Sequence, residues 1–345
     1  MSKAFILIAG ARLPQDVWST LRPTLSDQHL QALSTLVAPA KDQALQDLGP
    51  VSHQRATHRV WLWRVLTQRT GAPHEAPWLW LSLGGRQLSQ EMWVLSLLPL
   101  NDNKEVESLA PSLDDGRFFE ISSHIDPLLR AAGWQLQLWD NNWFLTRRND
   151  FDAVSTPASA LIGKRPSRED LFGRQADELW GLLEALNGAL PPEILSSYTF
   201  WIWGGGKEEL FFPPTKVRAL AANDPISLGW ANASGILTQY LTSTEKGWPL
   251  DTPPGDVIAL IDTLYEPWLR HDWTTWLSRL PQVAEQVAAF RQQAQMREDT
   301  DILTVCFGVG NTASRLEKST DHFFSRFWPR DKVDPVEWLT DMSHD

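Results

Sequence analysis

The sequence lacks the residues on which several protein classes depend. It has one cysteine, Cys306, so it can form neither a disulfide framework nor a cysteine-rich metal site. It has no apolar run near the roughly 18 to 20 residues that span a bilayer as a helix. It also lacks basic excess, because 31 Lys and Arg stand against 42 Asp and Glu, a net charge of −11. These absences argue against a disulfide scaffold, a helical membrane protein and a general binder of nucleic acid or anionic membranes, and they favour a cytoplasmic protein.

The start of the chain carries a short apolar run that imitates a secretion signal. Lys3 precedes five apolar residues at positions 4–8, and Ala9-Gly10-Ala11 follows them like a cleavage site. The run is shorter than the about seven residues of the smallest signal cores. A β-branched run that stops at a glycine is typical of a buried strand. We therefore expect a first β-strand here and no signal peptide.

What the sequence does have is a globular composition, with 43% hydrophobic and 21% charged residues in a chain of 345, and an unusual 19 tryptophans. Apolar periodicity and stop signals predict alternating helices and strands, and therefore a mixed, largely parallel α/β sheet covered by helices. The expected division is an N-terminal half, 1–150, and a C-terminal half, 151–345, in one compact unit. Helices are expected at 26–36, 60–66, 118–132, 168–186, 257–269, 273–295 and 315–327, and strands at 4–8, 78–83, 92–98, 199–203 and 301–307.

The clearest local signal is a β-hairpin near 134–146. Residues 134–139 alternate strictly between apolar and polar side chains, and residues 143–145 continue the pattern. Asp140-Asn141-Asn142 between them is typical of a tight turn.

Motifs for catalysis and cofactor binding are weak. None of the eight histidines stands in an H-x-H or H-E-x-x-H arrangement, and there is no G-x-S-x-G elbow. Residues 308–313 match G-x-G-x-x-A, but too little chain follows for a dinucleotide-binding βαβ unit. Gly204-Gly205-Gly206 follows a predicted strand without the Walker spacing. It is consistent either with a backbone loop that approaches an anion or, more simply, with a tight turn that needs positive φ.

Three W-x-W pairs distinguish the sequence. On a strand, the period of two places both indoles of a pair on one face, whereas on a helix they diverge. The second and third pairs could therefore form flat platforms for sugars, bases or a protein. The alternative is that they pack the sheet against its helices. The pairs are Trp61/Trp63, Trp78/Trp80 and Trp201/Trp203.

The order of several short segments resembles a bacterial family, the RpfE-type regulatory proteins, also described as cofactor-independent phosphoglycerate mutase-like. The resemblance covers nearly the whole chain. It implies an alkaline-phosphatase-type α/β fold, two metal ions held by Asp and His, and a Ser or Thr nucleophile. The segments are Ile6-Leu7-Ile8-Ala9, 52–56, 78–83, Pro127-Leu128-Leu129 with Gly133-Trp134, 155–163 with Lys164, 174–183, 200–206, Asp272-Trp273 and 303–306.

The sequence departs from that family where the chemistry resides. The family's first strand ends in a metal-binding Asp-Gly, whereas this one ends in Ala9-Gly10, and no His-Gly-Asp motif follows later. Two-metal phosphoryl transfer needs such anionic donors to hold its ions. We therefore expect the fold to persist without catalytic residues, metal ligands or a cofactor.

The resemblance also suggests a binding site. The family's central helix carries an Arg, an Asn-Glu pair and a Gln, where this chain has Arg174, Asp177, Glu178 and, in place of Gln, Trp180. In the next strand a tryptophan replaces a small polar residue. Structural salt bridges are the competing explanation for these charges. The candidate ligand-binding or partner-binding residues are Arg174, Asp177, Glu178, Trp201, Trp203, Gly204, Gly205 and Gly206.

Three functional hypotheses follow. The leading one is a cytoplasmic, non-catalytic, mutase-like protein with a regulatory role that binds an unknown protein or small molecule, and neither membrane nor nucleic acid. The alternative is a cofactor-independent phosphoglycerate mutase or related metal-dependent phosphatase. The third is a binder of glycans or nucleic acid through tryptophan platforms.

Overall fold

Strand β1 (Ser2–Ile8) pairs with strands from the far end of the chain, and this pairing determines how the molecule divides. The computed structural model describes residues 2–37, 42–47, 51–86, 90–109, 115–207, 215–241, 254–297, 300–308, 312–318 and 334–341. Unit 1 combines Met1–Thr70 with Phe212–Asp345, and unit 2 is Gly71–Phe211. These boundaries differ from the expected division at 150, because β1 lies in register with both β12 (Asp256–Ile261) and β13 (Thr300–Phe307).

Unit 1 is built on a seven-stranded sheet, which confirms the expected mixed, largely parallel α/β class. The five strands from β11 to β13 are parallel, and β14 and β3 continue the sheet antiparallel. Ala4 and residues 6–8 of β1 and residues 257–261 of β12 are buried, as expected for parallel strands covered on both faces. The order is β11 (Leu237–Tyr240), β10 (Val217–Ala222), β12, β1, β13, β14 (Thr312–Lys318) and β3 (Asp42–Asp47).

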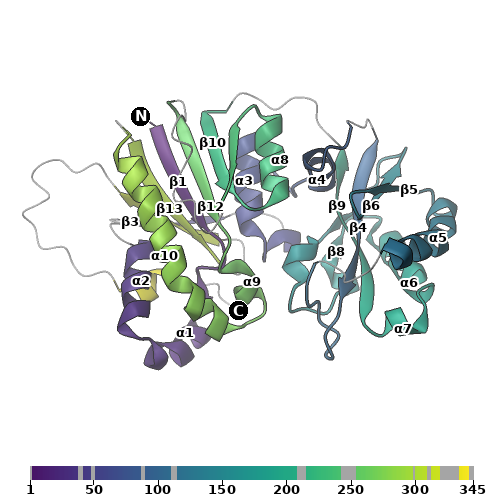
Figure 1. Ribbon diagram of the computed structural model, residues 1–345, viewed down its shortest axis with the longest axis horizontal. Helices are drawn as coiled ribbons and strands as arrows, with labels where there is room; N and C mark the ends of the chain where they lie inside the picture. The colour runs from purple at the N-terminus through teal and green to yellow at the C-terminus, as the bar shows by residue number, and fades with distance from the viewer. Residues whose placement is uncertain are drawn as a thin grey trace, which may run out of the picture. The chain divides into compact units, whose positions relative to one another are not determined.

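Helices cover both faces of this sheet (Figure 1). α10 (Trp273–Gln295) and α2 (Asp27–Val37) lie on one face, where Arg291 of α10 donates to Thr304 of β13 at 2.8 Å and to the carbonyl of Leu36 at 2.7 Å. α3 (Thr57–Thr67) and α8 (Pro225–Ala233) lie on the other, where Trp61 meets Phe5 of β1 with ring centroids 5.1 Å apart. Shorter elements of this unit are β2 (Leu13–Pro14), α1 (Gln15–Leu21), η1 (Arg22–Thr24), η2 (Val51–His53), α9 (Tyr265–Leu269), α11 (Pro335–Trp338) and β15 (Thr340–Asp341).

Unit 2 is built on a four-stranded antiparallel sheet. The predicted hairpin is confirmed as β5 (Gln135–Trp139) and β6 (Asn142–Arg147), joined by Asp140 and Asn141 with φ of 47° and 54°, the left-handed values of a type I′ turn. The order is β5, β6, β4 (Glu91–Pro99) and β9 (Tyr198–Lys207). The remaining elements are α4 (Ala76–Ser82), α5 (Asp115–Ala131), β7 (Val154–Ser155), η3 (Ala158–Leu161), η4 (Arg168–Asp170), β8 (Leu171–Phe172), α6 (Ala176–Gly188) and α7 (Pro192–Leu195).

Several sequence predictions were wrong in element type. The run 78–83, predicted as a strand, lies in helix α4 and its C-cap, Leu83, and Pro77 stands in the first turn of that helix. A short apolar run does not distinguish the two states. The run 257–269, predicted as one helix, is strand β12 followed by α9. The predicted helix 315–327 begins in strand β14, and its later part lies outside the described residues. The helix predicted from 168 begins only at Ala176, because η4 and β8 precede it.

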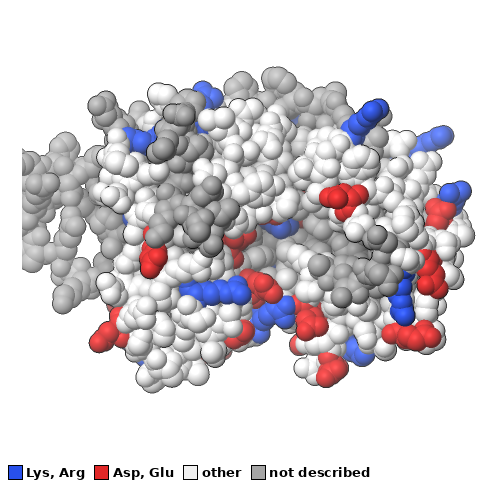
Figure 2. Space-filling model, viewed as in Figure 1, with Lys and Arg blue, Asp and Glu red and all other residues white. Residues whose placement is uncertain are grey.

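In the described part of the chain, no helix is long and apolar enough to cross a membrane. On the face shown in Figure 2, acidic and basic side chains are interspersed among the described residues, and no broad basic surface forms.

Candidate functional site

The charged residues that the sequence singled out lie near the start of α6, and each is held by its own partner. Arg174 pairs with Asp152, and Asp177 pairs with Arg168 at 2.6 Å. Glu178 accepts from Gln175 Nε2 at 2.9 Å. The Arg174 and Asp177 side chains are 88% and 89% exposed. These charges therefore form a solvated surface, and exposed ion pairs of this kind contribute little to stability.

Trp201 and Trp203 lie in the core of unit 2. Both point to the same face of β9, as the W-x-W spacing predicts for a strand, but they are 0% and 7% exposed. Their indole N–H groups donate to the Thr156 carbonyl and to Ser96 Oγ, each at 2.9 Å. Buried indoles cannot offer a flat surface to a sugar or base, so the platform hypothesis fails for these two, and also for the second pair, Trp78/Trp80. Trp61, Trp63, Trp78 and Trp80 are buried in helices α3 and α4.

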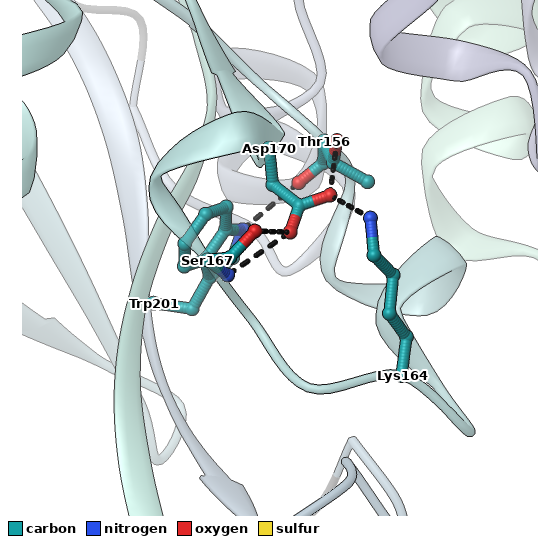
Figure 3. A network of polar contacts seen from close by, with 5 residues as sticks. All are labelled: Thr156, Lys164, Ser167, Asp170 and Trp201. Carbon is teal, nitrogen blue, oxygen red and sulfur yellow. Dashed lines mark hydrogen bonds and ion pairs between the residues drawn. The ribbon is translucent and has the colours of Figure 1, made fainter.

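The buried carboxylate of Asp170 holds the segment 156–170 in place, and Thr156 of that segment contacts Trp201 (Figure 3). Asp170 is 2% exposed and accepts from Lys164 Nζ at 2.5 Å and from the Ser167 N–H at 3.0 Å. Its backbone carbonyl accepts from the N–H of Thr156 at 2.8 Å, and the Thr156 carbonyl binds Trp201. The polar groups of this network bond to one another, so we assign the network a structural role.

The triple glycine is part of strand β9 and not a loop. The segment is therefore neither an anion-binding loop nor a tight turn, but the predicted need for positive φ is confirmed at Gly204. A Cβ at Gly205 would lie 2.0 Å from the Trp93 ring, and one at Gly206 would lie 2.2 Å from His74. Gly204 has a φ of +71°. Gly205 and Gly206 are explained by the rings that pack directly on the strand, and Gly204 is explained by its left-handed backbone conformation.

We expect Gly205→Ala to lower the free energy of unfolding by about 1–3 kcal/mol, because the Trp93 ring would have to move from a packed core. Gly181 is the matched control. It lies within α6, and a Cβ there would meet nothing within 4 Å. Gly181→Ala should stabilise the protein by about 0.5–1 kcal/mol, since it improves helix propensity. Urea unfolding of both variants tests this, and equal effects would contradict the packing explanation.

A different group of polar residues lies at the carboxyl edge of the unit 1 sheet. Asp224 follows β10 and caps α8, where its Oδ2 accepts from the N–H of Ser227 at 3.0 Å and from its Oγ at 2.5 Å. Its Oδ1 accepts from Arg59 of α3 at 3.1 Å, and both side chains are 9% exposed. Adjacent strands β10 and β12 are followed by α8 and α10 on opposite faces of the sheet. Ligands of open α/β sheets bind at such a switch point.

Three further titratable residues, His53, His58 and Asp262, interact electrostatically with Arg59 or Asp224. Burial and neighbouring charges determine their protonation. Burial, reinforced by the charge of Arg59, lowers the pKa of His53 to about 3 and that of His58 to about 3. Burial alone would raise the pKa of Asp224, but Arg59 and the hydrogen bonds from Ser227 outweigh it and lower that pKa. Burial, together with the charge of Asp224, raises the pKa of Asp262 to about 6. The two histidines are therefore neutral at pH 7.

Tyr265 connects this buried group to a surface cleft. Its ring meets His58 edge to face at 4.6 Å and stacks on Trp268 at 6.1 Å, and its hydroxyl donates to the Arg55 carbonyl at 2.7 Å. The cleft has a volume of about 380 Å³. Its walls are Pro14, Asp16, Val17, Thr20, Arg55, Trp268, His271 and Trp273.

Sequence reasoning missed this region because its residues come from distant segments. Asp262 follows a strand that was predicted as part of a helix, and Asp224 follows β10, a strand that was not predicted. An acid one or two residues after a buried parallel strand is the signal that could have found them. Of the cleft, the resemblance covered only Arg55, within segment 52–56, and Trp273, within the Asp272-Trp273 segment, and it assigned neither a role. The described residues include no group of three or more His, Cys, Asp or Glu side chains placed to hold a metal ion.

No family model matches the sequence, and no curated protein matches it. Among solved structures, the cofactor-independent phosphoglycerate mutase from Thermoplasma acidophilum is similar at 12% identity and a TM-score of 0.40, over 98% of this chain and 95% of that one. The PH0037 protein from Pyrococcus horikoshii is similar at 11% identity and a TM-score of 0.44, over 92% and 87%. Similarity of this degree says nothing about activity, and neither structure shows the RpfE-type family.

Proposed function

We propose that this chain is a non-catalytic protein of the mutase-like class that acts in a regulatory role by binding a ligand or partner. The observation that carries the proposal is the state of Asp224. Its two oxygens accept from Arg59 and Ser227, so the carboxylate at the switch point is already neutralised by a buried guanidinium. A two-metal phosphotransferase needs its anionic groups for the ions. Here the charge supports the fold.

The cleft supports the binding part of the proposal. Its volume of about 380 Å³ lies within the range of small-molecule sites, about 300–1,000 Å³. Two indoles, a guanidinium and a carboxylate line it, which is the combination of apolar surface and few polar groups that such sites use.

An assay with metal added back tests the proposal. The protein is stripped with a chelator, and mutase activity on phosphoglycerate and phosphatase activity on p-nitrophenyl phosphate are measured with Mn²⁺, Zn²⁺ or Mg²⁺, without bisphosphoglycerate. We expect no metal-dependent turnover and no stoichiometric metal in the isolated protein. Metal-dependent turnover that Asp224→Asn or Asp262→Asn abolishes would overturn the proposal in favour of the enzyme. Turnover unchanged in both variants would also overturn the proposal if it co-elutes with the chain on a further chromatography step, and would identify a contaminating enzyme if it separates from the chain.

A further inference from the structure

The cleft presents aromatic rings in an arrangement suited to a flat ligand. The His271 and Trp273 rings are nearly parallel, with centroids 5.5 Å apart and planes 13° apart. Trp268, which is 3% exposed, lies in the same wall. Aromatic side chains can stack on any heterocyclic base, because every base has a π-face.

His271 is held in a conformation that few residues other than glycine adopt. Its φ is +55°, in the left-handed region. Residues held in that region cost free energy and are enriched at ligand sites. The turn from α9 to α10 thus places an imidazole at the cleft, where a glycine would relieve the backbone.

The polar groups of the cleft are of opposite charge. Arg55 lines it with a guanidinium whose Nη2 is fixed by the carbonyl of Leu269 at 2.7 Å, and guanidinium groups favour phosphate. Asp16 lines it with an exposed carboxylate, which accepts hydrogen bonds from hydroxyl or amino groups and repels a second anion. The chemistry favours a ligand that is anionic at one end and carries hydrogen-bond donors elsewhere.

The walls are fixed before any ligand arrives. The Trp268 indole donates to the Arg12 carbonyl at 3.0 Å, and the Tyr265 hydroxyl holds the Arg55 carbonyl at 2.7 Å. Groups fixed in this way lose little conformational entropy on binding.

We propose that this cleft binds a nucleoside monophosphate. The base stacks against the aromatic wall of His271 and Trp273, the phosphate pairs with Arg55, and Asp16 accepts from the ribose hydroxyls or a base amino group. The inference rests on the proposed binding function and names the ligand class of that site.

Isothermal titration of the full chain tests the proposal with AMP, GMP, CMP and UMP as probes. The four corresponding nucleosides, ribose 5-phosphate and inorganic phosphate test the parts separately. We expect at least one monophosphate to bind at least about tenfold more tightly than its nucleoside, ribose 5-phosphate or phosphate alone. No binding by any monophosphate, or equal binding by inorganic phosphate, would overturn the proposal.

Variants locate the binding. Arg55→Met should weaken monophosphate binding at least about tenfold while leaving adenosine binding unchanged. Trp273→Leu should weaken both, whereas Trp273→Phe, which keeps a ring, should restore most of the affinity. His271→Gly should weaken binding without lowering the unfolding midpoint, which separates lost contact from misfolding. Arg130→Met, at an exposed ion pair with Asp126 in unit 2, is the control and should change nothing.

The two proposals fail in different ways. Binding that survives both Arg55→Met and Trp273→Leu would place the nucleotide elsewhere and overturn this inference. The metal assay does not depend on nucleotide, so its outcome judges the non-catalytic proposal separately.

Discussion

Arg59→Met should lower the free energy of unfolding of unit 1 by about 3–5 kcal/mol, because it leaves the charge of Asp224 buried without its partner. The Arg59 and Asp224 side chains are each 9% exposed and their contact is 3.1 Å, so water cannot replace the guanidinium. The hydrogen bonds from Ser227 remain, but they supply no compensating charge. Urea denaturation followed by reaction of the single thiol, Cys306, measures the effect on unit 1, since that thiol is fully buried in β13.

Two further variants show whether the loss comes from the unpaired charge. Arg59→Met combined with Asp224→Asn removes both charges and keeps a side chain that caps helices well, so it should recover much of the lost stability. Arg270→Met breaks an exposed pair with Glu266 at 3.1 Å and should cost at most about 0.5 kcal/mol. Equal losses in Arg59→Met and Arg270→Met would show that the buried pair has no special weight.

The sequence was sufficient to predict those parts of the fold whose signals are local. Helix α10 and strand β13 were predicted within a residue of their bounds, and the hairpin was predicted from its alternation and the Asp140-Asn141-Asn142 segment, of which Asp140 and Asn141 form the turn. The predictions for 78–83 and 257–269 failed because the apolar runs on which they rest are short and show no clear periodicity. In such runs, burial against other parts of the chain decides between helix and strand, and no local pattern records it.

The site was less predictable for a related reason. Asp224 and Asp262 come close enough to interact electrostatically because β10 and β12, which are separated in sequence, lie side by side, and Arg59 reaches Asp224 from helix α3. Conversely, Trp201 and Gly205 were predicted to bind a ligand or partner because they lie in a segment rich in tryptophan and glycine. Their chemistry is explained by packing, since the indole fills the core and the glycine admits the Trp93 ring.

Acidification should lower the free energy of unfolding of unit 1 at pH values well above those at which the carboxylates of its ion pairs are protonated. His53 and His58 have pKa values lowered from 6.5 to about 3, so between these values the unfolded chain binds two protons that the native state does not. Each contributes stability that is lost as pH falls, at about 1.4 kcal/mol per pH unit. Asp262 acts in the opposite direction, because its pKa is raised from 3.8 to about 6 and the native state holds the extra proton. Between about pH 6 and 4 the unfolded chain therefore binds a net one proton more than the native state. The free energy of unfolding should fall by about 1.4 kcal/mol for each pH unit of acidification.

Asp262→Asn isolates these opposing contributions. It removes the group that gains stability on acidification and leaves the two histidines unopposed, so the slope between about pH 6 and 4 should double. His53→Gln should have the reverse effect and flatten the slope of the parent protein. Urea unfolding of the three proteins across this range measures the slopes. Below that window the lowered pKa of Asp224 adds a further loss, because protonation breaks its pairing with Arg59. An unfolding free energy that stays constant from about pH 6.5 to 4.5 would contradict burial of neutral histidines in unit 1.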